Sequence, residues 1–319
     1  MKKLNLLIVA LLMITIYAGC KKNDAATSTP AATTASDNYT SMAAFHAQNG
    51  VPMQTFTINA ATGGSYTTPQ GTVVTIPANA FQTQAGGVVT GNVTIQFKDI
   101  YKKSDMLLSD KGTKYYDGTP LRSGGEFFIK AMQSNAALEL VIGKKISVSQ
   151  PRSQMGVLDT AMVPMIAVDT TGLNQPLWFP NPTDSLSLST NNYIFSLYQM
   201  NNPLDSGSWC NSDQAYFTGF TQTSLTLHPV DLVTIYSTQV YLLFSNMNSM
   251  VHVYYDGTTN FPYTFAPLNA QCTIVAVGVK NGKLYSSFTP ITITNNLTVN
   301  FTLSETTTAD FKTRLNTLN

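Results

Sequence analysis

The 319-residue chain is poor in charge and in the side chains that catalysis uses most. Charged residues make up 11% of the sequence, well below the ~25% of typical soluble proteins. There are only three histidines and three cysteines, and the glutamates are Glu126, Glu139 and Glu305. None of these glutamates has another carboxylate beside it in the sequence. This scarcity disfavours catalysis by a local pair of carboxylates.

Motifs that would indicate a particular reaction or ligand are also missing. The sequence has no Gly-x-Ser-x-Gly elbow, no glycine-rich phosphate loop, no His-Glu-x-x-His pair and no Asp-x-Asp-x-Asp-Gly calcium loop. The spacing of His228 and Asp231 resembles that of metal ligands, but a lone pair is more typical of a turn before a strand. Catalytic residues can converge from distant positions. The sequence nevertheless favours a protein that is not an enzyme and that uses no cofactor or metal.

The formal charge is close to zero, which disfavours nucleic acid as a partner. It is +1 for the whole chain, and loss of Lys2 and Lys3 would change it to −1 (1 − 2 = −1). Binding to nucleic acid depends on many Lys and Arg contacts to phosphates. No such excess of positive charge is present.

No apolar run is long enough for a membrane-spanning helix. The longest candidate, from Leu6 to Ala18, has 13 residues without a charge, whereas a spanning helix needs about 20. Two lysines before this run and small residues after it are typical of a secretory signal peptide. Residues 1–19 are therefore predicted to be a signal peptide.

The stretch Tyr17-Ala18-Gly19-Cys20 resembles the lipobox of bacterial lipoproteins, although Tyr17 departs from the usual Leu. The resemblance implies that Cys20 carries a diacylglycerol and becomes the acylated N-terminus, with acyl chains such as palmitate. Several acyl chains give stable membrane anchoring. The alternative is an ordinary signal peptide with a cysteine there by chance. Residues 20–41 lack an apolar pattern and are predicted to be a lipidated, flexible tether.

From Gln54 onward, apolar and polar residues alternate with a period of two. Alternation is clear in QTFTIN, TVVTIP, NVTIQFKDI, GGEFFIKAM and KISVSQP, and glycine pairs lie between these runs. Short alternating strands separated by turn residues indicate an antiparallel sandwich or barrel. The predicted fold is all-β, with two β-sandwich domains and a short C-terminal helix.

The stretch from Gly63-Gly64 through Gly71 and Pro77 to Ala80-Phe81 resembles the β-sandwich domain of ankyrins, netrin receptors and zonula occludens proteins. The resemblance covers Phe56 to Pro151. The runs IYKKSDMLLSD, SGGEFFIKA and ISVSQP also resemble a pattern in lipoproteins of Bacteroidetes bacteria. This resemblance implies that the protein is anchored in the outer membrane of the cell envelope. It leaves open whether the protein lies on the periplasmic or the exterior face. The self-cleaving His-aromatic-Ser motif of some eukaryotic relatives is absent. The first sandwich is placed at residues 42–151.

Residues 152–228 are less regular and are predicted to be an aromatic-rich connecting segment. Its large aromatic side chains either pack between domains or form a platform for sugar rings. The candidate platform consists of Trp178, Trp209, Tyr216 and Phe217.

The last third is patterned again and predicts a second, immunoglobulin-like sandwich at residues 229–303. The runs VYLLFSN, MVHVYYDG, TIVAVGVKNGKLYSSF, TPITITNN and LTVNFTLS are predicted as strands. Asn281-Gly282 between alternating runs favours a two-residue hairpin turn. The spacing of Phe311, Leu315 and Leu318 predicts a helix within residues 304–319.

Cys210 and Cys272 are the remaining thiols, and an exported protein is free to form disulfides. They form either one bridge or two separate buried thiols, and their surroundings in sequence favour the second. The function that follows is binding of a protein or envelope partner by a lipid-anchored, non-catalytic protein. The alternative is a glycan-binding lipoprotein of a polysaccharide-uptake system.

Overall fold

The computed structural model describes residues 37–151, 159–168, 177–200, 207–217, 219–230 and 237–319. These residues form an all-β fold of several sheets with few helices, as predicted. No helix among them is long and apolar enough to cross a membrane. The predicted signal peptide and most of the tether lie outside the described residues.

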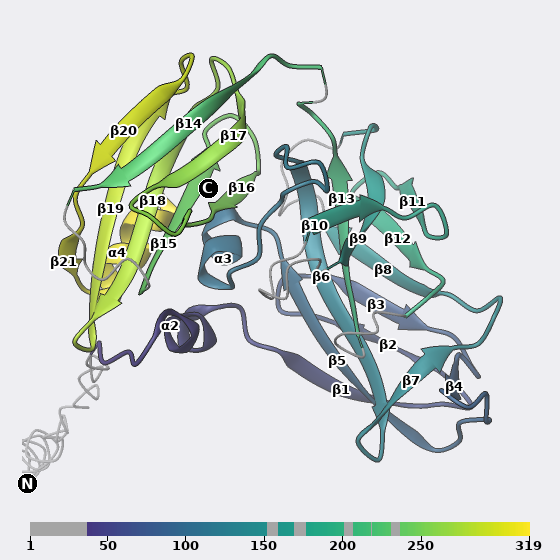
Figure 1. Ribbon diagram of the computed structural model, residues 1–319. Helices are drawn as coiled ribbons and strands as arrows, with labels where there is room; N and C mark the ends of the chain where they lie inside the picture. The colour runs from purple at the N-terminus through teal and green to yellow at the C-terminus, as the bar shows by residue number, and fades with distance from the viewer. Residues whose placement is uncertain (1–36, 152–158, 169–176, 201–206, 218, 231–236) are drawn as a thin grey trace, which may run out of the picture. The chain divides into compact units, whose positions relative to one another are not determined.

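The first β-sandwich consists of an eight-stranded and a five-stranded sheet (Figure 1). The larger sheet has the order β1-β5-β6-β13-β9-β10, with β7 pairing both β6 and β4. Its strands are β1 (Gln54–Asn59), β4 (Phe81–Thr83), β5 (Asn92–Ile100), β6 (Arg122–Gln133), β7 (Ala136–Leu140), β9 (Val163–Val168), β10 (Leu177–Pro180) and β13 (Ser208–Gln214). The smaller sheet, β11-β12-β8-β3-β2, contains β2 (Gly64–Thr67), β3 (Val73–Ile76), β8 (Ile146–Pro151), β11 (Ser185–Leu188) and β12 (Asn192–Leu197).

The segment predicted to connect two domains instead supplies strands to this sandwich. In the larger sheet β13 lies between β6 and β9, and in the smaller sheet β12 pairs with β8 along six residues. The prediction of an irregular connection is therefore corrected. The sequence does predict two strands in this segment, at Asp159 to Val168 and at Tyr193 to Gln199, where β9 and β12 lie. It does not indicate that they belong to the first sandwich, because the partners of the segment's strands lie far away in sequence: Cys210 pairs with Phe127, for example.

A β-bulge interrupts the pairing of β6 and β13. Asn211 pairs with Glu126 and Asp213 with Ser123, so that Gly124 and Gly125 together face Ser212. Gly125 has a φ of 121°, and a Cβ there would lie 2.5 Å from the ring of Tyr101. The glycine pair therefore lies inside a strand, where the sequence had indicated a boundary between strands.

The second β-sandwich combines a three-stranded sheet, β17-β14-β20, with a five-stranded sheet, β16-β15-β18-β19-β21 (green to yellow in Figure 1). Its strands are β14 (Gln222–Pro229), β15 (Thr238–Phe244), β16 (Met250–Val253), β17 (Phe261–Pro267), β18 (Gln271–Lys280), β19 (Lys283–Thr292), β20 (Leu297–Phe301) and β21 (Ser304–Thr306). The hairpin at Asn281-Gly282 is confirmed, with φ values of 53° and 80°. The pair β14·β20 is parallel, which the alternation alone could not indicate.

Three short helices complete the described fold: α2 (Met42–Asn49), α3 (Lys103–Leu108) and α4 (Thr308–Asn316). The Ser41 hydroxyl accepts a hydrogen bond from the Ala44 amide and caps α2. Thr307 caps α4 in the same way through Asp310, and Phe311 and Leu315 are buried, as the predicted helical face requires. The Asp37 carboxylate also accepts a hydrogen bond from the Thr308 amide at 2.8 Å, which joins the start of the described chain to its last helix.

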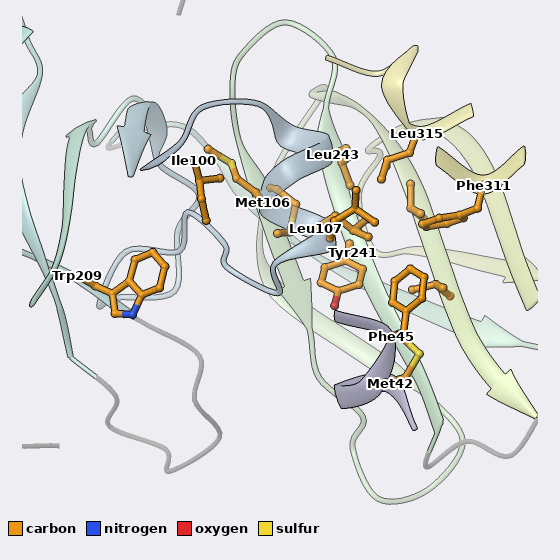
Figure 2. Packing of buried hydrophobic residues seen from close by; sticks show 14 of the residues in the cluster. Met42, Phe45, Ile100, Met106, Leu107, Trp209, Tyr241, Leu243, Phe311 and Leu315 are labelled. Carbon is orange, nitrogen blue, oxygen red and sulfur yellow. The ribbon is translucent and has the colours of Figure 1, made fainter. Parts of the chain in front are cut away.

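Each sandwich has its own apolar core, and a third cluster surrounds the helices. Phe97, Phe127 and Phe195 lie in the first core, and Phe244 and Ile274 in the second. Figure 2 shows the third cluster, where side chains of all three helices meet residues of both larger sheets. Its labelled members are Met42, Phe45, Ile100, Met106, Leu107, Trp209, Tyr241, Leu243, Phe311 and Leu315.

Candidate functional site

The two tryptophans of the predicted aromatic platform are core residues. Trp178 in β10 is 0% exposed, and its indole N–H donates a hydrogen bond of 2.6 Å to the Gly112 carbonyl. Trp209 in β13 is 8% exposed, and the Lys111 ammonium lies 5.3 Å from its ring centroid. Neither indole presents a free ring face to solvent. The four-residue platform is therefore wrong for the tryptophans. The alternative of packing between domains, which the sequence favours, is confirmed for both, because they belong to the cluster around the helices.

The other two platform residues line an open pocket at the end of the second sandwich. The pocket has a volume of about 570 Å³. Its walls come from three connections that can be followed in Figure 1: β13 to β14, β15 to β16, and β17 to β18. The lining residues are Tyr216, Phe217, Phe220, Thr221, Phe244, Asn246, Met247, Leu268, Asn269, Ala270 and Gln271. We call this the loop-end pocket.

Aromatic rings form one side of the loop-end pocket. Tyr216 and Phe220 are 41% and 48% exposed, whereas Phe217 is buried and packs against Phe244 in the core. The rings of Tyr216 and Phe220 have centroids 5.7 Å apart and planes inclined by 32°. The guanidinium of Arg122 lies 4.8 Å from the Tyr216 ring centroid. The buried Phe217 thus fixes the position of two exposed neighbours.

Polar groups of the pocket come from exposed amide side chains. Asn246, Asn269 and Gln271 are all exposed, and their side-chain amides make no hydrogen bond with any residue in the described ranges. Their backbones are held instead: the Asn269 amide donates to the Ile293 carbonyl at 2.8 Å, and the Gln271 carbonyl accepts from Ser245 at 2.9 Å. Each side chain therefore offers two donors and one acceptor oxygen at a fixed place.

The chemistry of this lining is that of recognition. Tyr216 is the only ionisable side chain among the lining residues given above. General acid–base catalysis needs a positioned group that exchanges a proton near the working pH. Rings and neutral amides can instead contact an apolar surface and form hydrogen bonds with hydroxyl or peptide groups.

Sequence reasoning found part of this pocket and missed the rest. Tyr216 and Phe217 were singled out, whereas Phe220 and the three amides were not. The run Tyr216-Phe217-Thr218-Gly219-Phe220 contained a signal, because three aromatic residues surround a glycine in a loop. The amides carried no signal in sequence, since Asn and Gln are common in turns.

The remaining predicted sites have separate outcomes. Cys210 and Cys272 are free and buried in different cores, so the bridge is not formed and the favoured interpretation of two structural thiols is confirmed. Nδ1 of His228 donates a hydrogen bond of 3.0 Å to Oδ1 of Asn260, and Asp231 lies outside the described residues. Within the described ranges, no group of three or more His, Cys, Asp or Glu side chains could hold a metal ion. Cys20, the predicted lipidation site, also lies outside them.

Comparison with known proteins adds no relative. No protein-family model matches the chain, and a search of curated proteins returned no match.

Proposed function

We propose that this protein is a lipid-anchored, non-catalytic protein of the bacterial cell envelope that binds a protein partner. The anchor would be the acylated Cys20 in the outer membrane. The predicted tether of residues 20–41 would be shorter than predicted, because Asp37 is hydrogen-bonded to Thr308, Tyr39 is buried and Ser41 caps α2. The part that binds would be the loop-end pocket. This proposal is supported by the signal-like N-terminus, by the lipobox resemblance and by the chemistry of the pocket.

The observation that carries the binding role is the combination of exposed rings with unused amides in one pocket. Aromatic residues are enriched where proteins bind one another, because a rigid ring buries much apolar area at little entropic cost. Amide side chains match the donor and acceptor pattern of a peptide backbone. A segment of a partner protein that packs one apolar side chain against the exposed rings of Tyr216 and Phe220 fits this lining.

A photo-crosslinker placed in the pocket tests this role. We would incorporate benzoylphenylalanine at position 220 in the full chain, in cells, and at position 116 as the matched control. Tyr116 is an aromatic residue of the first sandwich that is 50% exposed and lies outside the loop-end pocket. A protease-sensitive adduct specific to position 220 is expected. Equal adducts at both positions, or none at 220, would contradict the proposal.

A second candidate function is glycan binding, which the geometry of the two exposed rings favours. Tyr216 and Phe220 are adjacent and only moderately inclined, and amides lie on the neighbouring loops. Sugar rings stack on such faces while their hydroxyls form hydrogen bonds with amides. In the same experiment, an adduct at position 220 whose added mass is lost on periodate treatment, and whose tryptic digest contains no peptide of a second protein, would identify a glycan instead of a protein.

The anchor is tested separately by the substitution Cys20→Ala. If Cys20 is acylated, this variant is expected in the soluble fraction, because the tether and the sandwiches supply no other apolar anchor. Membrane fractions washed with carbonate, followed by immunoblotting, would measure it. Retention of Cys20→Ala in the washed membranes would rule out lipid on Cys20 as the anchor.

A further inference from the structure

A second pocket, on the outer face of the larger sheet of the first sandwich, gathers positive charge. It has a volume of about 660 Å³ and lies against α2, β5, β6 and the segment after α3. Its lining residues are Ala43, His46, Ala47, Met53, Gln96, Lys98, Ser109, Asp110, Lys111, Phe128, Lys130, Trp209 and Gln239. We call this the lysine groove.

Three lysines from different segments converge in the lysine groove. Gln96 pairs with Lys130 and Lys98 with Phe128 across β5 and β6, so that Lys98 and Lys130 are diagonal neighbours on one face. Lys111 follows α3, and its ammonium lies over the buried ring of Trp209. The sheet register therefore holds the Lys98 and Lys130 stems side by side, with Phe128 and Trp209 beneath them.

Two of these lysines have no counter-ion of their own. Lys98 and Lys130 make no hydrogen bond or ion pair with any residue, so far as the described ranges extend. Burial, and then the charge of Lys111, lower the pKa of Lys98. The positive charges of Lys98 and Lys111 repel each other, and an anion bound between the lysines would relieve this repulsion.

The acidic residue of the groove is already engaged elsewhere. The Asp110 carboxylate accepts hydrogen bonds from the Tyr241 hydroxyl at 2.8 Å and from Gln239 at 3.4 Å, and it lies 3.2 Å from Nδ1 of His252. The remaining polar groups are neutral donors, such as Gln96 and Ser109, which can add hydrogen bonds to an anion. The groove thus has an excess of positive charge together with unused donors.

We propose that the lysine groove binds a phosphate-bearing ligand through Lys98, Lys111 and Lys130. Three separate ammonium groups suit a compact group with several charges and three or more acceptor oxygens. A lone carboxylate is more often held by the planar fork of an arginine, and no arginine lines this groove. The phosphate would belong either to a free small molecule or to a phospholipid headgroup.

The test compares two double variants of the full chain that change the net charge equally. Lys98→Gln/Lys130→Gln removes the two unpaired lysines of the groove. Lys145→Gln/Lys280→Gln, the control, removes two exposed lysines outside it. The wild type and both double variants are purified in detergent, and circular dichroism and the melting temperature confirm that each protein is folded. Binding of inorganic pyrophosphate is then measured by titration calorimetry at constant ionic strength.

The groove variant is expected to bind pyrophosphate at least tenfold more weakly than the wild type, with the control unchanged. The lipid source is tested by flotation of Cys20→Ala chains with phosphatidylglycerol vesicles, again comparing the two double variants. If the control variant floats with the vesicles and the groove variant does not, and pyrophosphate is not bound, the proposal is supported with a lipid headgroup as the ligand. Equal weakening in both double variants, or no binding of either probe by the wild type, would overturn it.

Discussion

Two buried carboxylates on opposite faces of the larger sheet in the first sandwich, those of Asp99 and Glu126, differ in their hydrogen bonding. Asp99 in β5 lies on the face of Phe97 and Phe127, toward the sandwich core, and is 0% exposed. Glu126 in β6 lies on the opposite face with Ile100 and is also 0% exposed. The two acids lie on the neighbouring strands β5 and β6. Differences in their hydrogen bonding therefore come from the residues that pack on each face.

Asp99 is fully provided with donors. Its carboxylate accepts hydrogen bonds from the hydroxyls of Thr68 and Thr72 at 2.7 and 2.6 Å, and from the amides of Gln54 and Gln70 at 3.1 and 3.2 Å. Such a network replaces the water that a buried carboxylate loses. The inner face can accept this acid because β1 and the loop between β2 and β3 supply donors around it.

Glu126 has no comparable partners. Neither of its carboxylate oxygens, nor one oxygen of the nearby Asp213, has a hydrogen-bond partner among the described residues. Burial, and then the negative charge of Asp213, raise the pKa of Glu126 well above its ordinary value, while Lys111 opposes this shift. The comparison teaches that burial alone does not decide what an acid costs, since hydrogen-bond donors do.

The largest effect is expected when the interior strands β12 and β13 are removed from the two sheets. A fragment of residues 56–151 lacks β12 and β13, which pair with β8 and β6. We expect it to show no cooperative unfolding, because both sheets lose interior partners. A fragment of residues 51–214, which retains these strands, is the control. Cooperative melting of the shorter fragment by circular dichroism would contradict the assignment of these strands to the first sandwich.

A smaller but still large effect is expected for Asp99→Ala. The substitution removes the carboxylate that accepts hydrogen bonds from two buried threonine hydroxyls and two side-chain amides, of which Gln70 keeps the carbonyl of residue 99 as an acceptor. The free energy of unfolding should fall by about 3–5 kcal/mol. Urea denaturation measures this difference, and Asp99→Asn, which keeps one acceptor oxygen, should lose less. A loss below about 1 kcal/mol for Asp99→Ala would show that the network contributes little.

Glu126→Gln should change how stability depends on pH. With a folded-state pKa above the unfolded value, the folded protein keeps the proton to higher pH, so that the free energy of unfolding falls as pH rises above about 4.5. One such group contributes a slope of up to about 1.4 kcal/mol per pH unit. Glu126→Gln should flatten the profile above pH 5. An unchanged profile would show that Glu126 does not hold this proton.

The smallest effect concerns the thiols of the two cores. Cys210 faces the apolar side of the larger sheet beside Phe127, and Cys272 lies in the second core, where burial raises the pKa of its thiol to about 12. We expect both thiols to resist iodoacetamide in the native protein. Both should react after unreduced denaturation, adding two carbamidomethyl groups by mass spectrometry. A single disulfide mass instead would contradict two free thiols.

Local patterns predicted the elements that depend on neighbours in sequence. Alternation located β5, β15 and β18, and the Asn281-Gly282 turn followed from backbone preference alone. Strand β17 was missed because Pro262 and Pro267 interrupt its pattern, and an edge strand tolerates proline since half of its N–H groups need no partner.

Long-range partners explain the rest of what the sequence could not indicate. Trp178 reaches the carbonyl of Gly112 across 66 positions, so that no local pattern could separate a buried indole from an exposed one. The loop-end pocket likewise combines three connections from different parts of the chain. Only its aromatic loop had a recognisable composition.

The hydrogen bond between Asp37 and Thr308 cannot form until Thr308 has been synthesised. The two residues are 271 positions apart, and at roughly 5–20 residues per second the later one is made tens of seconds after the first. Until then Met42 and Phe45 of α2 lack Phe311 and Leu315 of α4 as neighbours. A chain that is cut short before α4 therefore leaves apolar surface exposed near its first helix. Such a surface marks an unfinished molecule for chaperones and proteases.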